Sequence, residues 1–374
     1  MVIAINTRVL SGNSAIRQLL IDCCEMIAVN HPEHEFIFIA EKDFKEQNNS
    51  LGNVKKIVLP QQSNNPLLWK LWYNYKLPSL LKKANTNILI SADGVCSLRT
   101  KVQQCLLVND LAFLHHPEWY SKKYLRFIKS STSDFLHTAK TIITYSDVLK
   151  KEIINRYSII ENSITVIPAA SEKKYQPVNQ ETREEVKEKY TEGKEYFLFN
   201  GAIHPRSNLV NLLKAFSLFK KRQKSNMQLV IASPDPSADI AFVESIQSYK
   251  YRAEVKLLNN LDETSLTEIT ASAYACINTS PLHNEIAGLL NAMECEVPVI
   301  AGNLKVAIEV LGDAALLVNP ELPENIAEKL MLLYKDENKR NELVKKGLEQ
   351  SAKYSLTKTA DKFWQNILTT MQPA

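Results

Sequence analysis

The sequence predicts an α/β protein with two doubly wound parallel-sheet domains. Continuous apolar runs of strand length alternate with amphipathic stretches of helix length along nearly the whole chain. Strands that are apolar throughout are typical of parallel sheets covered by helices on both faces. The chain has 374 residues, which is enough for two domains at about 150 residues each.

A charged and irregular stretch over residues 171–195 divides the chain. Glu, Lys and Gln are abundant there, as in segments that connect domains. We therefore expect an N-terminal domain over residues 1–170, a linker over 171–195 and a C-terminal domain over 196–352.

The first domain opens with an apolar strand, Val2 to Ile5, and a helix from about Ala15 to Val29. The loop between them holds Asn6-Thr7-Arg8 and a single glycine, Gly12. Ser146 is expected to cap the helix that it precedes. Further apolar strands are predicted at residues 35–40, 56–59, 87–90, 105–108, 141–144 and 164–167.

The segment from Asn65 to Lys83 interleaves aromatic and apolar residues with lysines. One interpretation is a basic aromatic helix that rests on a membrane surface. The other is a core helix whose lysines extend into solvent. Because Pro78 interrupts the helical pattern, the core interpretation is favoured. A second basic group at nearly helical spacing faces an anionic acceptor, a membrane or simply water: Lys122, Lys123, Arg126 and Lys129.

In the second domain, apolar strands are predicted at residues 197–200, 228–233, 254–258, 275–277 and 297–300. Helices are predicted at about 209–219, 239–249, 261–271, 286–295, 322–334 and 336–351. Residues 275–300 thus form a strand, loop, helix and strand, in which ligands lie where the loop leaves the first strand. His283, Asn284 and Glu285 stand in that loop, just before a helix N-terminus that offers N–H groups to phosphate.

Composition excludes several classes of protein. With 45% hydrophobic and 23% charged residues, the chain is typical of a soluble globular protein. It has no apolar run of transmembrane length and no signal peptide at its start, so we expect a cytoplasmic protein. The net charge of +4 is too small to indicate nucleic acid as a partner. The six cysteines lie in apolar segments without metal-ligand spacing and are expected to be reduced core residues.

Two further loops follow predicted strands and carry polar residues. Asn109 and Asp110 come directly after the strand at 105–108, where a polar pair points to a ligand; the alternative is that Asp110 caps a turn. Gly201, Arg206 and Ser207 follow the strand at 197–200. A guanidinium at a helix N-terminus is suited to phosphate, and the alternative is an exposed turn that caps the helix.

The segment Asn278–Ile300 resembles the signature of retaining family 4 of the GT-B glycosyltransferases, the group 1, mannosyltransferase-like enzymes. Ser280, the pair Ala292-Met293 and the run Val297-Pro298-Val299 match that signature. The run from Glu309 to Pro320 is also similar to a family segment. The polar positions differ, because the first family glutamate falls on His283 and the second on Asn291.

Other parts of the chain carry the same resemblance. Asn109-Asp110 corresponds to a family His-Asp pair, and Asn6-Thr7-Arg8 to an Asp-Ala-Arg segment. The stretch from Gly201 to Leu209 is similar to the family's phosphate-binding loop. The family lysine that grips the donor diphosphate is Ser207 here, whereas Arg206 keeps the preceding basic residue.

The resemblance implies a GT-B fold, with two Rossmann-like domains facing a cleft and residues 353–374 packing back toward the first domain. It implies transfer of a hexosyl group, with retention, from a nucleotide sugar to a glycan or lipid-linked acceptor, without a metal or other cofactor. Peripheral contact with the inner face of the membrane fits such an acceptor. His283 and Glu285 would be catalytic. The substrate-binding residues would be Gly201, Arg206, Ser207, Asn284, Asn291, Asn109, Asp110 and Arg8.

A non-catalytic interpretation stays open. Five positions depart together from the family pattern: Asn109, Ser207, His283, Asn284 and Asn291. At these positions the chain lacks a cationic phosphate ligand and two carboxylates that the family has. The alternative to an enzyme is therefore a catalytically impaired homologue that acts as a binding or scaffold protein in a polysaccharide pathway.

Overall fold

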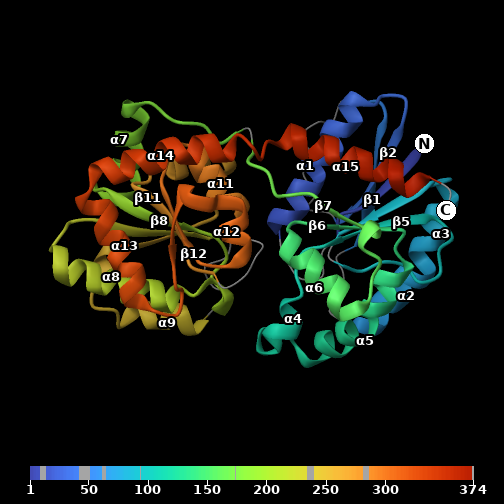
Figure 1. The fold of residues 1–374 in the computed structure, drawn as a ribbon, viewed down its shortest axis with the longest axis horizontal. Coiled ribbons are helices and arrows are strands. Elements are labelled where there is room, and N and C mark those ends of the chain that lie inside the picture. Colours follow the sequence, from blue (N-terminus) through green and yellow to red (C-terminus); the bar gives the residue numbers. More distant parts are fainter. Residues whose placement is uncertain are drawn as a thin grey trace. The chain divides into compact units, whose positions relative to one another are not determined.

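The structure is a computed structural model that describes residues 1–8, 14–41, 51–60, 65–92, 94–172, 174–233, 240–280 and 286–372. It divides into two compact units, each described by itself below (Figure 1). Unit 1 consists of Met1–Ala169 together with Leu356–Ala374, and unit 2 of Ala170–Ser355. Both are parallel-sheet α/β units, so the predicted fold class is confirmed.

Unit 1 is built on a seven-stranded parallel sheet in the order β3-β2-β1-β4-β5-β6-β7. Its strands are β1 (Val2–Asn6), β2 (Glu35–Glu41), β3 (Val54–Leu59), β4 (Ile88–Ser91), β5 (Gln103–Val108), β6 (Thr141–Thr144) and β7 (Ile164–Val166). Its helices are α1 (Ser14–Asn30), α2 (Pro66–Leu71), α3 (Leu77–Lys83), α4 (Ala112–His115), α5 (Lys122–Thr138), α6 (Asp147–Tyr157) and α15 (Leu356–Met371). Shorter turns are the π-helical η1 (Trp72–Lys76) and the 3-10 turns η2 (Pro117–Trp119) and η3 (Glu161–Ser163).

Alternate residues of each buried strand serve opposite faces of this sheet. On β5 and β6, Leu106 and Ile142 join the core that α2, α3, α5 and α6 cover. Their neighbours Cys105 and Thr141 instead contact α15, where both donate to the Asn366 side-chain oxygen, at 3.2 and 3.1 Å. The last helix therefore completes unit 1, although unit 2 separates it from the rest of that unit in sequence.

Unit 2 is built on a six-stranded parallel sheet in the order β10-β9-β8-β11-β12-β13. Its strands are β8 (Tyr196–Asn200), β9 (Gln228–Ser233), β10 (Val255–Asn259), β11 (Ala275–Asn278), β12 (Val299–Gly302) and β13 (Ala315–Val318). Its helices are α7 (Gln180–Thr191), α8 (Leu209–Gln223), α9 (Ile240–Gln247), α10 (Glu263–Ala271), α11 (Ile286–Glu294), α12 (Lys305–Leu311), α13 (Pro323–Lys335) and α14 (Glu337–Ser351). The 3-10 turns are η4 (Pro205–Ser207), η5 (Arg252–Glu254) and η6 (Gly312–Ala314).

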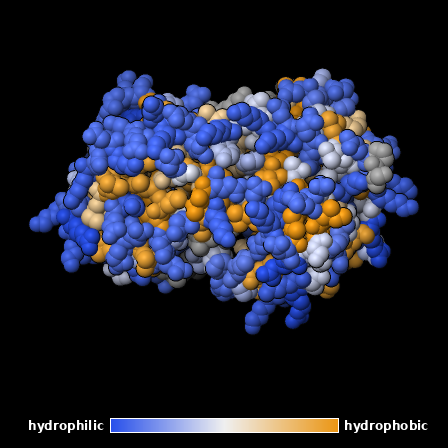
Figure 2. Space-filling view, in the orientation of Figure 1, coloured by the Kyte–Doolittle hydropathy of each residue, from blue (hydrophilic) through white to orange (hydrophobic). Residues whose placement is uncertain are grey.

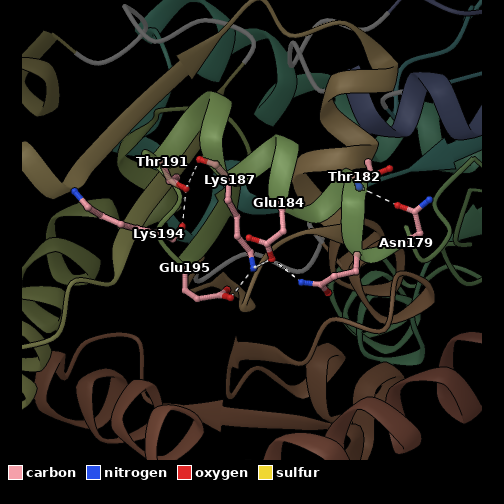
Figure 3. A network of polar contacts seen from close by, with 8 residues as sticks. Asn179, Thr182, Glu184, Lys187, Thr191, Lys194 and Glu195 are labelled. Atoms are coloured by element: carbon pink, nitrogen blue, oxygen red, sulfur yellow. Dashed lines mark hydrogen bonds and ion pairs between the residues drawn. The ribbon is translucent and has the colours of Figure 1, made fainter.

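Residues 171–195 were expected as a linker, part of it a short helix; in the structure they contain α7 and group with unit 2. Asn179 caps this helix by accepting a hydrogen bond from the Thr182 N–H at 2.8 Å. Lys187 is buried and pairs with Glu184 at 3.1 Å and Glu195 at 2.6 Å (Figure 3). α7 has few apolar residues, of which Val186 joins the core of unit 2 and Tyr190 packs against it, and Lys187 ties the helix to Glu195. The surface over α7 and α14 is correspondingly hydrophilic (Figure 2).

Several smaller expectations also have an outcome. Ser146 caps α6, as predicted, by accepting a hydrogen bond from the Leu149 N–H at 3.2 Å. All six cysteines are buried and free, which confirms the core interpretation. Within the described part of the chain, no helix combines the length and the apolar character needed to cross a membrane.

Candidate functional site

The candidate donor loops lie at the carboxyl ends of neighbouring strands in unit 2. β8 and β11 pair in the sheet, so Gly201, after β8, and Thr279, after β11, follow strands that end at the same edge. Gly201 is packed closely, because a Cβ atom there would lie 3.1 Å from the Phe199 ring. This close approach explains a glycine at the position without any direct role in binding.

Asn208 ties the loops at this edge together. Its side-chain amide donates to the Thr279 carbonyl at 3.3 Å and to the Pro320 carbonyl at 2.6 Å, and so joins the loops that follow β8, β11 and β13. Asn208 has a φ of 56°, in the left-handed region, which asparagine tolerates better than most residues. The amide therefore fixes the backbone where η4 ends and α8 starts.

Arg206 lies in η4 on a main chain that is held from both sides. Its N–H donates to the His204 ring nitrogen Nδ1 at 3.1 Å, and its carbonyl accepts from the Ser280 hydroxyl at 3.0 Å. The next residue, Ser207, is fully buried and its hydroxyl donates to the Ala202 carbonyl at 2.6 Å. Arg206 is thus presented by a rigid loop, whereas Ser207 closes that loop.

Asn291 is buried in α11 and contacts Glu172. Its side-chain oxygen accepts from the Glu172 N–H at 2.8 Å, and its side-chain nitrogen donates to Glu172 Oε1 at 3.0 Å. The other carboxylate oxygen of Glu172 pairs with Lys174 at 2.7 Å, and Lys174 also lies 3.4 Å from Glu263. Burial lowers the pKa of Lys174, but the hydrogen bond and charge of Glu172, with Glu263, outweigh it and raise that pKa above its ordinary value.

In unit 1, Asn109 is buried at the end of β5. Neither polar atom of its side chain has a hydrogen-bond partner within the described chain. It lines a cavity of about 30 Å³ together with Asp110, Tyr120 and Tyr124, which is room for about one water molecule. A buried amide without a partner is costly to the fold, so it marks a position where a bound group is expected. Asp110 accepts from the Ala112 N–H at 2.9 Å, as in the turn-capping interpretation.

Arg8 lies in the loop after β1 and is buried. Its guanidinium stacks over the Trp72 ring, 4.7 Å from the centroid, and donates to the Pro60 carbonyl at 3.3 Å. Two neighbouring groups hold the same loop: Asn6 donates to the Tyr73 hydroxyl at 3.2 Å, and Thr7 to the Ile39 carbonyl at 3.1 Å. Arg8 therefore links β1 to the helical segment α2–η1.

Comparisons with known proteins bear on this arrangement. Residues 180–350 match the family model described as glycosyl transferases group 1. The O-antigen chain mannosyltransferase B of Escherichia coli is 25% identical over 262 residues, which are 70% of this chain and 67% of that protein. RfbU of Salmonella typhimurium, another O-antigen chain mannosyltransferase, is 26% identical over 68% of this chain and 67% of its own.

Solved structures agree on the fold. WaaG, a glycosyltransferase of lipopolysaccharide biosynthesis, matches with a TM-score of 0.76 at 12% identity, over 97% of this chain and 98% of its own. HepE of Anabaena, solved with UDP-glucose, matches with a TM-score of 0.74 at 13% identity, over 99% of this chain and 100% of its own. This chain shares the GT-B fold of these glycosyltransferases, and its residues 180–350 match the group 1 family.

The polar residues of the candidate site are only partly brought together. Unit 2 joins Gly201, Arg206 and Ser207 in one loop and sets Asn291 apart on α11. Asn109, Asp110 and Arg8 belong to unit 1. His283, Asn284 and Glu285 lie outside the described residues. Among the residues that are described, no three His, Cys, Asp or Glu side chains are grouped as metal ligands would be.

Sequence reasoning missed three residues that hold the candidate site together: Asn208, Glu172 and Lys174. The sequence indicated Asn208 only as one residue of a family motif. The motif does not predict the long-range hydrogen bonds that its side chain makes. Glu172 and Lys174 fall in the stretch that was assigned to a linker. The one available signal was their opposite charge two residues apart.

Proposed function

We propose that this chain is a GT-B mannosyltransferase that uses a nucleotide sugar and extends a glycan or lipid-linked acceptor of a surface polysaccharide. The observation that carries the proposal is the similarity to two O-antigen chain mannosyltransferases over 68% to 70% of the chain. Retention of the anomeric configuration and independence of metal ions belong to the same proposal, and both rest on the resemblance to family 4.

In this proposal unit 2 binds the donor. The loop held by Asn208 and Ser280 presents the Arg206 guanidinium to the diphosphate. A positive charge on a preorganised loop stabilises the negative charge that develops on the leaving diphosphate. His283 and Glu285 are proposed to contact the sugar as catalytic residues, and Asn284 is proposed to bind the substrate. Asn291, with the Glu172 carboxylate that it holds, is proposed to face the ribose hydroxyls.

Unit 1 is proposed to bind the acceptor. Asn109 offers one hydrogen-bond donor and one acceptor that the fold does not use, and a sugar hydroxyl can satisfy both at once. Asp110 is placed beside it in the same cavity lining, and Arg8 is proposed to fix the adjacent loop. This assignment needs the small cavity to widen when the acceptor enters.

The test is donor binding and turnover in the same preparation. Thermal shifts and calorimetric titration with GDP, GDP-mannose, UDP and UDP-glucose should select one nucleotide. Arg206→Gln should weaken binding of that nucleotide about tenfold or more, because a charge-assisted hydrogen bond contributes about 1.5–3 kcal/mol. Arg222→Gln, at the exposed end of α8, is the matched control and should leave binding unchanged.

Turnover is followed with labelled donor and a lipid-linked glycan acceptor. NMR of the new linkage should show the donor's own anomeric configuration, and EDTA should leave the rate unchanged. Inversion would exclude a retaining mechanism, and a rate that falls with EDTA and recovers with a divalent ion would exclude metal independence. The mannosyl assignment fails if another sugar nucleotide is the better donor.

A second candidate is a glycan-binding or scaffold protein without turnover. Two hydrogen bonds favour it: the Ser207 hydroxyl donates to the Ala202 carbonyl, and the Asn291 side-chain amide donates to the Glu172 carboxylate. Neither position then supplies the charged group that the family uses there. Binding of nucleotide or glycan without any transfer, under conditions where a related mannosyltransferase is active, would establish this function instead.

A further inference from the structure

We propose that unit 1 has a binding site for a small organic phosphate at the amino-end edge of its sheet. The site is a groove of about 620 Å³ between the strands β1, β2 and β3 and the end of α3, and is called the basic groove below. Small-molecule sites have volumes of about 300–1,000 Å³. The inference does not depend on the proposed reaction, because it rests on the place, the lining and the charge of this groove.

The basic groove lies across the sheet from the candidate site residues of unit 1. Val2 and Glu35 are the first residues of β1 and β2, and Lys55 is the second residue of β3; all three line the groove. Arg8 and Asn109 instead follow the carboxyl ends of β1 and β5. Since these strands run parallel, the groove and the candidate site residues lie at opposite edges of the sheet. The groove is therefore a separate site.

The floor of the groove is apolar. Val2, Ile37 and Ile57 line it, and they share one face of the sheet, because paired residues and every second residue of a strand face the same side. The same face carries Ile39, which joins the core together with Leu77 of α3. The core of unit 1 thus covers part of this face, and the groove leaves the part near the strand starts accessible to a ligand.

The polar lining comes from two different elements. β3 is the edge strand of the sheet and supplies Lys55 and Lys56. The end of α3 supplies Lys83, and the turn after it supplies Asn85. Lysines on an edge strand also keep that strand from pairing with another chain. Lys83 and Asn85 do not lie on the strand, so protection of the edge does not account for them.

The turn that presents Asn85 is fixed by main-chain hydrogen bonds. The Asn85 N–H donates to the Lys82 carbonyl at 3.2 Å, and the Thr86 N–H donates to the Leu81 carbonyl at 3.0 Å. Asn85 has a φ of 50°, in the left-handed region that asparagine tolerates better than most residues. Asn85 is exposed, so its amide offers a hydrogen-bond donor from a fixed backbone beside Lys83.

The lining of the groove carries a net positive charge. It holds three lysines and one acidic residue, Glu35, so its net charge is +2. Lys55 and Glu35 pair at 2.7 Å and offset each other. The excess positive charge comes from Lys56 and Lys83. Each ammonium group offers three donors, which suit the oxygens of a phosphate, so the charge of the groove complements an anion.

The apolar floor distinguishes an organic phosphate from inorganic phosphate. Inorganic phosphate would use the lysines and leave Val2, Ile37 and Ile57 in water. A phosphate monoester of a sugar or a nucleoside places its charge at the lysines and its ring on the floor, which removes apolar surface from water. The shared chemistry of the ligand is therefore a phosphate group on a ring-shaped organic body.

The experiment is calorimetric titration of the full chain with mannose 6-phosphate, AMP and inorganic phosphate. At least one of the two organic phosphates should bind saturably and more tightly than inorganic phosphate. Added salt should weaken this binding, because it screens the charge of the lysines. The tighter of the two organic phosphates identifies the body, sugar or nucleoside, that the floor accepts. Arg206→Gln, which alters the candidate donor loop of unit 2, should leave the binding unchanged.

Variants of the lining locate the binding. Lys55→Gln/Lys83→Gln should weaken it about tenfold, through the loss of charge-assisted contacts. Ile57→Thr should weaken binding of the organic phosphate about threefold and leave inorganic phosphate unchanged, because only apolar contact is lost. The matched control is Lys101→Gln/Lys151→Gln, which removes two exposed lysines of unit 1 that do not line the groove and should bind like the wild type. Circular dichroism melting without ligand confirms that each variant is folded.

Four outcomes would overturn the proposal. Two of them are the absence of saturable binding by either organic phosphate and wild-type affinity in Lys55→Gln/Lys83→Gln. The third is loss of binding in Arg206→Gln, which would assign the ligand to unit 2. The fourth is inorganic phosphate that binds as tightly as both organic phosphates, since the floor would then contribute nothing. None of these readouts involves transfer, so failure here is distinct from failure of the proposed function.

Discussion

Asn291 bonds to both the main chain and the carboxylate of Glu172, which lies 119 positions away in the sequence. The resemblance identified position 291 as a departure from the family glutamate, but no local pattern could name its partner. The same holds for Asn208, whose amide reaches Thr279 and Pro320. Residue types at the site could thus be predicted from the sequence, whereas their partners required the fold.

Restoring the family glutamate at position 291 should destabilise the protein. Asn291→Glu places a second carboxylate about 3 Å from that of Glu172, where the amide now donates. Loss of a hydrogen bond to a charged group costs about 1.5–3 kcal/mol, and repulsion adds to it. The repulsion disappears when one of the two carboxylates is protonated, so the destabilisation should be largest at neutral pH and smaller in acid.

Urea unfolding of the wild type and the variant at neutral and mildly acidic pH measures this effect. The matched control is Glu172→Gln/Asn291→Glu. It exchanges the amide and the carboxylate between the two positions, so that one of each is again present. The double variant should recover most of the lost stability at neutral pH. A single variant as stable as the wild type would show that the two side chains do not meet in solution.

At the scale of elements, most strands could be predicted because each is a short apolar run with buried neighbours. β13 was not predicted as a strand of its own, and α7 was assigned to a linker. The sequence of α7, from Gln180 to Thr191, carries seven charged residues and one aliphatic one, Val186. With a single aliphatic residue, apolar periodicity is too weak to set the bounds of this helix, so the sequence indicated no more than a short helix within a charged stretch.

Lys187 should stabilise unit 2 in a pH-dependent way. Burial lowers the pKa of Lys187, but its contacts with Glu195 and Glu184 outweigh burial and raise that pKa above 10.5. A raised pKa means that the contribution is fully present below 10.5 and is lost as the pH rises through the folded value. Lys187→Met should cost about 1–2 kcal/mol at neutral pH, between the values for exposed and buried pairs.

Chemical unfolding at neutral pH and at successively more alkaline pH tests this prediction. The difference between the wild type and Lys187→Met should shrink as the solution passes the pKa of the lysine. Lys345→Met, an exposed lysine on α14, is the control and should show little difference at any pH. A constant difference across the range would mean that packing of the methylene chain, and not charge, is what Lys187 contributes.

At the scale of the molecule, unit 1 is discontinuous, since the chain leaves it at residue 169 and returns at 356. Two parallel-sheet units were predicted, because alternating strands and helices on either side of a charged stretch require them. The order of strands within each sheet was not predicted, since sequence order alone does not decide which strands pair. The return of the last helix to the first unit came from the resemblance alone.

Unit 1 should therefore depend on α15, although unit 2 does not. Ile367 is fully buried in this helix, beside the Asn366 that bonds to Cys105 and Thr141. Ile367→Ser should cost about 3 kcal/mol or more, from the cavity and the buried hydroxyl. Hydrogen–deuterium exchange should show faster exchange across β4, β5 and β6, with α8 and β11 unchanged. Gln365→Ser, at an exposed position of the same helix, should leave both units protected. Faster exchange in unit 2 as well would mean that the two units unfold as one, and that their separate cores do not make them separate in stability.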